Sequence, residues 1–243
     1  MSEAAPSPGD RGPRRLFWPT TISLGAVLIT ASLGIWQVQR LHWKTALIAD
    51  RQARVEAPAL AELPADAAAA QAAEFRRIKV TGSFRHEREA HLAATTDRGN
   101  VGFQIITPFR LANGREILIN RGWVPTARRD AATRAAGQVA GEVTIEGLIR
   151  PGGKPGWFAA PPNDVRRNLW IWLDLEAISA ELGVSPAPAF IIDAGPAPNP
   201  GGLPLGGQTR VALPNDHWQY ALTWFGLSAV FAIMYVIYWR QNR

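Results

Sequence analysis

The chain has 243 residues, a formal net charge of +6, ten tryptophans and no cysteine. The lack of cysteine excludes disulfides, thiolate metal sites and a cysteine nucleophile. The positive charge comes without basic runs interleaved with aromatic residues, so we expect no nucleic-acid partner. Several tryptophans lie near the ends of long apolar runs, as is typical of protein segments that cross a membrane–water interface. We therefore expect the lipid membrane to be a partner.

The first apolar run follows a tail rich in proline, glycine and serine. Residues 1–16 predict a disordered cytoplasmic tail, and residues 17–39 predict a transmembrane helix. A signal-peptide core is the alternative, because basic residues precede the run. The run is long for such a core, ends in Trp36 and Gln37, and precedes no convincing cleavage site, all of which favour an uncleaved helix.

The middle segment, residues 40–216, predicts an extracytoplasmic (periplasmic) domain rich in β-strands. Its start can extend the first helix, and residues 57–73 are an Ala/Pro-rich linker or variable helix. Asn113-Gly114 between two apolar runs predicts a hairpin, and Gly183 is expected to end a short helix at 174–182. The expected strands cover residues 76–84, 102–110, 116–120, 141–150, 169–173 and 189–193, with a helical turn at 130–136.

Two conspicuous pairs of residues in this segment carry weaker signals. His86 and His91 lack zinc-site spacing, so we interpret them as solvated turn residues. Arg121 and Trp123 follow a predicted strand, and they form either a recognition surface or a structural turn with a buried tryptophan.

The second apolar run predicts a transmembrane helix at residues 217–240, followed by a short cytoplasmic tail at 241–243. The expected fold is therefore an α+β membrane protein, with two transmembrane helices flanking a mostly antiparallel β-rich domain with short helices. Basic residues are nearly balanced around the first helix, and we expect both termini in the cytoplasm.

His217 stands at the predicted start of the second helix, where Asn215 or Asp216 can cap the backbone. The helix dipole there disfavours an imidazolium, and a neutral imidazole can bind a metal. Tyr220 and Trp224 lie near the same face, together with the small residues Ala221 and Ser228, which suits a flat apolar ligand such as haem. The alternative is an interfacial residue with no ligand, like Trp218.

The end of the first helix is the second candidate. Trp36, Arg40 and Trp43 share one helical face, and Arg40 can meet a haem propionate or a lipid phosphate. Ordinary anchoring by tryptophan and arginine is the alternative. The chain has no G-x-S-x-G motif, phosphate loop or dinucleotide fingerprint, although a Ser–His–Asp triad stays open because its members need not be neighbours.

Five motifs make the chain similar to the Surfeit locus protein 1 family, the assembly factors of haem–copper cytochrome c oxidase. They are LGIWQVQRLHWK at 33–44, FRRIKVTGSF at 75–84, VGFQIITPF at 101–109, NRGWVP at 120–125 and PNDHWQYALTWF at 214–225. The occurrence of all five motifs in this order, between two predicted apolar helices, is specific to this family.

The resemblance implies a non-enzymatic protein that transiently binds haem a and assists its insertion into oxidase subunit I. It implies His217 as a haem iron ligand. The helical spacing described above adds Tyr220, Trp224, Trp36 and Arg40 as candidate cofactor-binding residues. The family motif has a second asparagine where this chain has Asp216, whose carboxylate can orient the ring or raise its basicity.

Subunit I, haem a synthase and the lipid membrane are the implied partners, and a bacterial inner membrane is the expected location. The alternative function is a membrane-tethered scaffold that stabilises oxidase subunits or haem synthase without binding haem.

Overall fold

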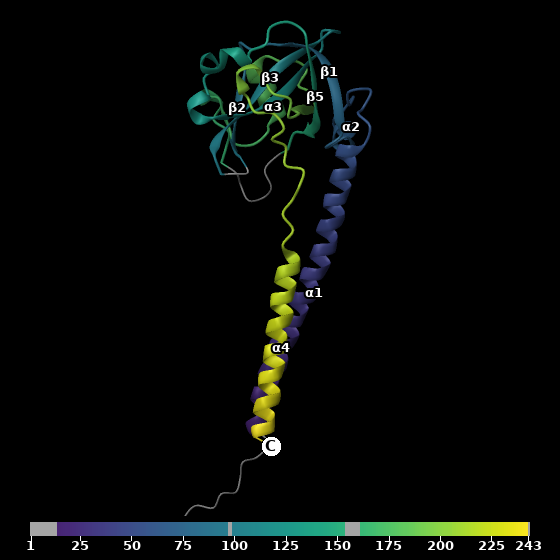
Figure 1. Ribbon diagram of the computed structural model, residues 1–243, viewed down its shortest axis with the longest axis vertical. Coiled ribbons are helices and arrows are strands. Elements are labelled where there is room, and N and C mark those ends of the chain that lie inside the picture. The colour runs from purple at the N-terminus through teal and green to yellow at the C-terminus, as the bar shows by residue number, and fades with distance from the viewer. Residues whose placement is uncertain (1–13, 97–98, 154–160, 243) are drawn as a thin grey trace, which may run out of the picture. The chain divides into compact units, whose positions relative to one another are not determined.

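The computed structural model describes residues 14–96, 99–153 and 161–242 (Figure 1). The chain divides into two compact units. One contains most of the first helix and all of the last, and the other comprises Asp50–Ala212. Most of the predicted disordered tail, residues 1–13, lies outside the described residues. The prediction was wrong for residues 14–16, which already belong to a helix.

The helical unit is built from α1 (Arg14–Glu56) and α4 (His217–Gln241), which lie side by side in opposite directions (Figure 1). Near one end of the pair, Thr20 Oγ1 and Tyr235 Oη are 2.7 Å apart. In the middle, Ser228 Oγ donates to the Val27 carbonyl at 3.2 Å. These contacts hold the two helices in one register.

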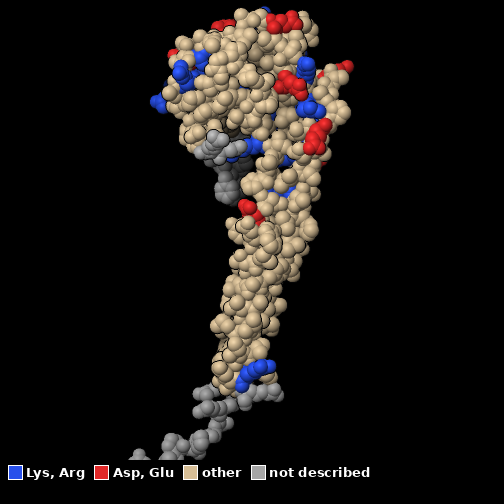
Figure 2. Space-filling model, in the orientation of Figure 1, with Lys and Arg blue, Asp and Glu red and all other residues tan. Residues whose placement is uncertain are grey.

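Both helices are long and apolar enough to cross a membrane, judged by length and composition alone. Among the described residues on the face drawn in Figure 2, charge is nearly absent along most of the helical pair, and basic residues appear at its lower end. The apolar side chains of this unit are largely exposed, as expected of helices that face lipid rather than a protein core.

The second unit holds a sheet of seven strands in the order β1-β5-β7-β4-β3-β2-β6. Antiparallel pairs predominate, but β2–β6 and β4–β7 are parallel, so the sheet is mixed. The strands are β1 (Arg77–Phe84), β2 (Ala90–Thr95), β3 (Val101–Leu111), β4 (Glu116–Pro125), β5 (Val143–Pro151), β6 (Leu169–Trp170) and β7 (Phe190–Ala194).

An additional pairing between β1 and β3 closes the sheet into a barrel. The first half of β3 pairs with β2, whereas its last residues, Phe109–Leu111, pair with β1. The register of β3 against β4 shifts between Gln104 and Ile106, a bulge of the kind that bends a strand. Strands β1, β5, β7, β4 and β3 therefore form a closed ring of hydrogen-bonded neighbours.

Two apolar clusters stabilise this barrel. Its inside is filled by side chains such as Ile78, Phe109 and Phe190. Outside, α3 (Leu175–Leu182) covers Ile106, Leu118 and Ile191 on three adjacent strands. The central strand β4 is thus buried on both faces, which explains its long continuous run of buried residues.

The remaining elements are short. They are α2 (Ala67–Ala72) and the 3-10 turns η1 (Thr126–Arg128), η2 (Ala131–Gly137), η3 (Val165–Arg167) and η4 (Pro200–Gly202). The Asn113-Gly114 hairpin is present, with Gly114 at φ +82°. The predicted helix at 174–182 is α3, where the Asp174 side chain accepts from the Ala177 N–H and Gly183 ends the helix at φ +67°.

Some strand predictions need correction. β2 was not predicted at all, because a turn was expected up to His91. β4 runs on to Pro125, whereas a turn was expected after Asn120. β6 has two residues where five were expected, because the parallel stretch of β2 that pairs with it is short.

Candidate functional site at the start of the last helix

The His217 side chain is held by a residue of the other helix. Its Nδ1 lies 2.7 Å from Gln37 Oε1, and the Gln37 side chain is buried within the helical pair. A carboxamide oxygen only accepts hydrogen bonds, so Nδ1 donates, and in a neutral ring Nε2 then keeps its lone pair. The ring is thereby fixed in the tautomer that can bind a metal through Nε2.

The start of α4 differs from the expected side-chain cap. Asp216 is the N-cap residue, yet its carboxylate makes no capping hydrogen bond. The Asn215 amide instead donates to Thr45 Oγ1 on α1 at 3.1 Å. The prediction that Asn215 or Asp216 caps through its side chain was wrong, and Gln37 rather than Asp216 is the hydrogen-bond partner of the His217 ring.

Among the described residues, the other predicted site residues make no side-chain hydrogen bond to His217 or Gln37. Trp224 is half-buried, whereas Trp36 and Tyr220 are 52% and 57% exposed. The Arg40 guanidinium lies 3.9 Å from the Trp43 ring centroid, so these two do share a face. Within residues 14–96 and 161–242, no hydrogen bond or ring contact joins Trp36 or Arg40 to His217, Tyr220 or Trp224.

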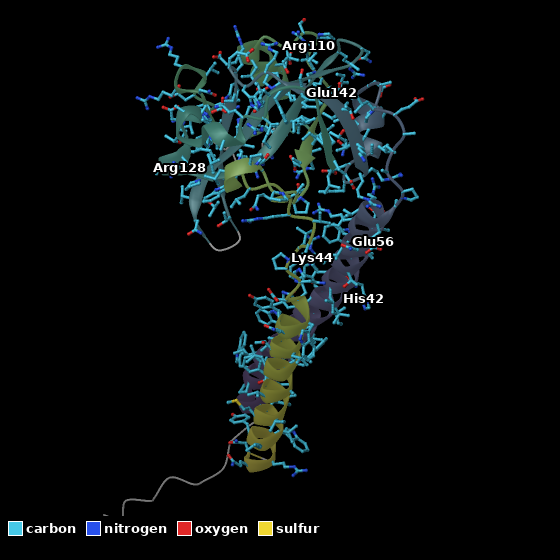
Figure 3. The ribbon with its side chains drawn as sticks, turned by 45° about the horizontal axis from the view of Figure 1, so that its top comes forward. His42, Lys44, Glu56, Arg110, Arg128 and Glu142 are labelled. Carbon is cyan, nitrogen blue, oxygen red and sulfur yellow. The ribbon has the colours of Figure 1, made fainter. Side chains whose placement is uncertain are left out.

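Gln37 is the residue that the sequence interpretation missed. A signal existed, because Gln37 is a polar residue at the end of an apolar run, and polar residues in membrane helices usually have a partner or a function. His42 and Lys44 also lie beyond this run, and they point to different sides of α1 (Figure 3). Neither is engaged with His217 by any hydrogen bond.

A second polar group lies inside the β-sheet unit, around Glu89. Its carboxylate accepts from Arg134 Nη2 and from His91 Nε2, the latter at 2.9 Å. Arg129 Nε donates to the opposite ring nitrogen of His91 at 3.1 Å. We call Glu89, His91, Arg129 and Arg134 the Glu89 cluster. His91 is thus part of a largely buried network on β2, and its interpretation as a solvated turn residue was wrong.

His86 and Arg121 form an adjoining pair. His86 Nε2 donates to the Val139 carbonyl at 2.9 Å, and Nδ1 accepts from Arg121 Nη1 at 3.3 Å. His86 does lie in a turn, as expected, but its ring is half-buried and hydrogen-bonded at both nitrogens, so the expectation that it is solvated was wrong. Arg121 is only 2% exposed and stacks on Phe84, so it cannot belong to a recognition surface. Trp123 is buried as the alternative required, but inside a strand rather than a turn.

Burial and neighbouring charges shift the pKa values of this region. Desolvation, reinforced by the charge of Arg134, lowers the pKa of Arg121 to about 10. Desolvation also lowers the pKa of His86, and the nearby Arg121 adds to this effect. Burial alone would raise the pKa of Glu89, but the His91 hydrogen bond and the Arg134 charge outweigh it and lower that pKa.

These shifts predict that acid destabilises the β-sheet unit. A lowered folded-state pKa means that the unfolded chain binds more protons, so stability falls as pH falls. The loss should begin near the ordinary His86 value of 6.5 and deepen near the ordinary Glu89 value of 4.5. Thermal unfolding followed by tryptophan fluorescence from about pH 8 to about pH 4 measures both stages. His86→Gln should remove the first stage, and a midpoint independent of pH would contradict the prediction.

Among the described residues, no three or more histidine, aspartate or glutamate side chains cluster to hold a metal ion. The four histidines, all within the described ranges, bond to Val139, Arg121, Glu89, Arg129 or Gln37, or make no hydrogen bond, and none bonds to a serine. Of the two histidines that keep a free ring nitrogen in the described residues, His42 and His217, only His217 has a ring oriented by a hydrogen bond.

These features define a class: a mixed-sheet domain flanked by two apolar helices, one of which begins at a histidine oriented by the other. A family model described as "SURF1 family" matches residues 24–229. The chain is 38% identical to a SURF1-like protein of Monosiga brevicollis, covering 93% of this chain and 88% of that protein. It is 41% and 39% identical to Surfeit locus protein 1 of Mus musculus and Homo sapiens, covering 81% of this chain and 68% and 69% of those proteins.

The chain belongs to the SURF1 family, as its five motifs predicted. The same comparisons correct the predicted location. The matching relatives described above are eukaryotic, which overturns the expectation of a bacterial inner membrane with both termini in the cytoplasm.

Proposed function

We propose that this chain is an assembly factor for haem–copper cytochrome c oxidase that binds haem a and assists its insertion into subunit I. Residues 17–39 and 217–240 are the proposed membrane spans, and subunit I and haem a synthase are the proposed partners. The observation that carries the proposal is the hydrogen bond between His217 Nδ1 and Gln37 Oε1, because it leaves Nε2 free for iron.

The residues present fit a haem as the transferred cargo. Haem iron takes an axial nitrogen ligand, and a histidine whose other nitrogen donates a hydrogen bond is oriented and made more basic. Trp224 and Tyr220 supply flat apolar surface on the same helix. Arg40 forms no ion pair with any described residue, and its guanidinium suits a propionate. In this proposal, His217 holds the iron and Gln37 fixes the ring.

A spectroscopic experiment tests the ligand. The full chain is co-expressed with the enzymes of haem a synthesis, purified in detergent, and its visible spectrum recorded. We expect His217→Ala to lose the haem signal. Gln37→Leu should weaken haem binding about 10–100-fold, because it removes the hydrogen bond that orients the ligand. His42→Ala is the matched control, since His42 is an exposed histidine on α1, and it should behave like the parent chain.

Two outcomes would overturn the proposal. A His217→Ala chain that holds as much haem as the parent would remove the ligand assignment. A parent chain that carries no haem, while a His217→Ala chain still supports oxidase assembly in cells, would leave the membrane-tethered scaffold as the function. The exposed Trp36, Trp43 and Trp218 suit the protein or lipid contacts of such a scaffold.

A further inference from the structure

A small cavity lies at one end of the barrel, within the β-sheet unit, and measures about 190 Å³. Side chains on one face of a strand recur every two residues. The outermost inward positions of β1, β5 and β7 continue the face of the buried core, and their side chains line the cavity: Phe84, Val143, Ile145 and Ala194. Because these side chains are only partly buried, this end of the barrel interior is incompletely filled.

On β4 the corresponding inward position is a charged residue, Arg121. It follows the core residues Ile117 and Ile119 at the same spacing of two. Arg121 lines the cavity and is only 2% exposed, so it lies inside the end of the barrel rather than on the outer surface. A guanidinium therefore stands where the neighbouring strands carry apolar side chains.

The contacts of Arg121 leave its charge without an anion of its own. Its Nη1 donates to His86 Nδ1 at 3.3 Å and its Nη2 to the Gly137 carbonyl, and both acceptors are uncharged. Its Nε is buried with no hydrogen-bond partner, and Arg121 forms no ion pair with any described residue. The carboxylate that influences its pKa, that of Glu89, already accepts from two other side chains of the Glu89 cluster. Buried charges are ordinarily paired, so Arg121 is suited to an anionic ligand.

The other polar residues of the cavity wall do not neutralise this charge. Thr144 and Glu146 alternate with the inward residues of β5, so their side chains face outward. The Glu146 side chain is 58% exposed, and its Oε1 lies 3.9 Å from Arg77 Nη1 on the same outer face. Asn199 Nδ2 donates to the Pro204 carbonyl at 2.6 Å. Among the described residues that line the cavity, Arg121 is therefore the only charged one that faces inward.

The remaining side chains of the wall are apolar. Besides the four inward residues, they come from the turn before β5 and the loop after β7: Val139, Ala197, Pro198 and Pro200. A water molecule occupies about 30 Å³ of liquid, so the cavity has room for roughly six water volumes. This size excludes a lipid or a haem and admits an acid with a few carbon atoms. The wall favours such an acid over a bare inorganic anion, because burying its hydrocarbon removes apolar surface from water.

We propose that this end of the barrel binds a small aliphatic monocarboxylate, whose carboxylate pairs with the Arg121 guanidinium. Its hydrocarbon body lies against Val143, Ile145 and Pro200. Hydrogen bonds between a guanidinium and a carboxylate are charge-assisted, and one cation matches an acid with a single negative charge. The cavity belongs to the β-sheet unit, whereas His217 belongs to the other unit, so the inference goes beyond haem binding and does not depend on it.

Calorimetric titration of the full chain in detergent, at constant pH and ionic strength, tests the site. The probes are butyrate, its neutral analogue butyramide, acetate and inorganic phosphate. We expect saturable binding of butyrate, with butyramide about tenfold weaker because it lacks the charge, and acetate about tenfold weaker because it buries two fewer methylene groups. Phosphate should also bind more weakly than butyrate. Equal binding of butyramide would overturn the role of charge, and acetate or phosphate binding as tightly as butyrate would overturn the aliphatic ligand. No saturable binding of butyrate would overturn the site.

Two variants and a control localise the binding. Arg121→Met keeps a long side chain but removes the charge, so it should weaken butyrate binding about tenfold and abolish the preference for butyrate over butyramide. Val143→Phe adds hydrocarbon at an inward position of the wall and should weaken both ligands by filling the cavity. Arg128→Gln, at an exposed arginine that does not line the cavity (Figure 3), should bind like the parent.

Unchanged butyrate affinity in either cavity variant would contradict the assignment, as would an equal loss in Arg128→Gln. The two cavity variants perturb the fold differently, since one removes a buried charge and the other adds hydrocarbon to a partly filled space. Unfolding midpoints recorded alongside identify a variant that has lost its fold, and the other variant then decides the result. The comparison of butyrate with butyramide on the parent chain needs no variant.

Discussion

Replacing Glu89 with alanine should lower the free energy of unfolding of the β-sheet unit by about 3–5 kcal/mol. The Glu89 side chain is 11% exposed, and the side chain of its partner Arg134 is 2% exposed. Removing the carboxylate leaves the Arg134 charge buried beside Arg121, which is itself buried and has no carboxylate partner of its own among the described residues. Chemical denaturation of the full chain, followed by tryptophan fluorescence, measures the loss.

Glu87→Ala is the matched control for this experiment. Glu87 is two residues away and also faces an arginine, Arg85, at 3.4 Å, but its side chain is 69% exposed. Solvent screens such pairs, so the control should change stability by at most about 1 kcal/mol. Equal losses in the free energy of unfolding from the two substitutions would show that the contribution of the Glu89 cluster to stability does not depend on its burial.

Gly122→Ala should destabilise the same unit by about 4 kcal/mol, because it forces two backbone segments apart. Gly122 has φ +121°, and an added Cβ would lie 2.0 Å from the Leu205 carbonyl oxygen. That carbonyl accepts from the Trp123 N–H at 2.8 Å, and the Leu205 N–H donates to the Trp123 carbonyl at 2.8 Å. Denaturation midpoints of the parent and the variant give the difference.

Gly114→Ala separates the steric effect from backbone strain. Gly114 also has positive φ, +82°, but no atom lies within 4 Å of the added Cβ. Its cost should be about 1–2 kcal/mol, the ordinary penalty for a side chain in the left-handed region. A loss at Gly122 no larger than this would contradict the close approach of Leu205.

Local signals in the sequence predicted the elements that form from neighbouring residues. Hydropathy located α1 and α4, Asn113-Gly114 located the β3–β4 hairpin, and Asp174 with Gly183 bounded α3. β2 was not predicted, because it follows a charged stretch and its apolar pattern is weak. Its stability comes from pairing with β3 and β6, which are distant contacts that no local pattern encodes.

In the candidate site, too, the sequence predicted the local feature but not the contact between distant residues. His217 was found because a histidine at a helix start is a local feature. Its partner Gln37 lies 180 residues earlier, and their contact depends on the register between α1 and α4. The Glu89 cluster likewise joins β2 to the turns after β4, so its burial follows from strand order, which the sequence alone does not reveal.

The closed pairing of β1 with β3 limits how other proteins can recognise this domain. Many domains bind partners by adding a foreign strand to an open sheet edge. Here each strand of the barrel has neighbours on both sides, and the outermost strand of the described sheet, β6, has only two residues. The backbone of Thr95 on β2, where β6 no longer pairs, is already engaged by Arg210. An incoming polypeptide therefore finds little backbone to pair with, and selectivity among partners has to come from the shape and chemistry of surface side chains.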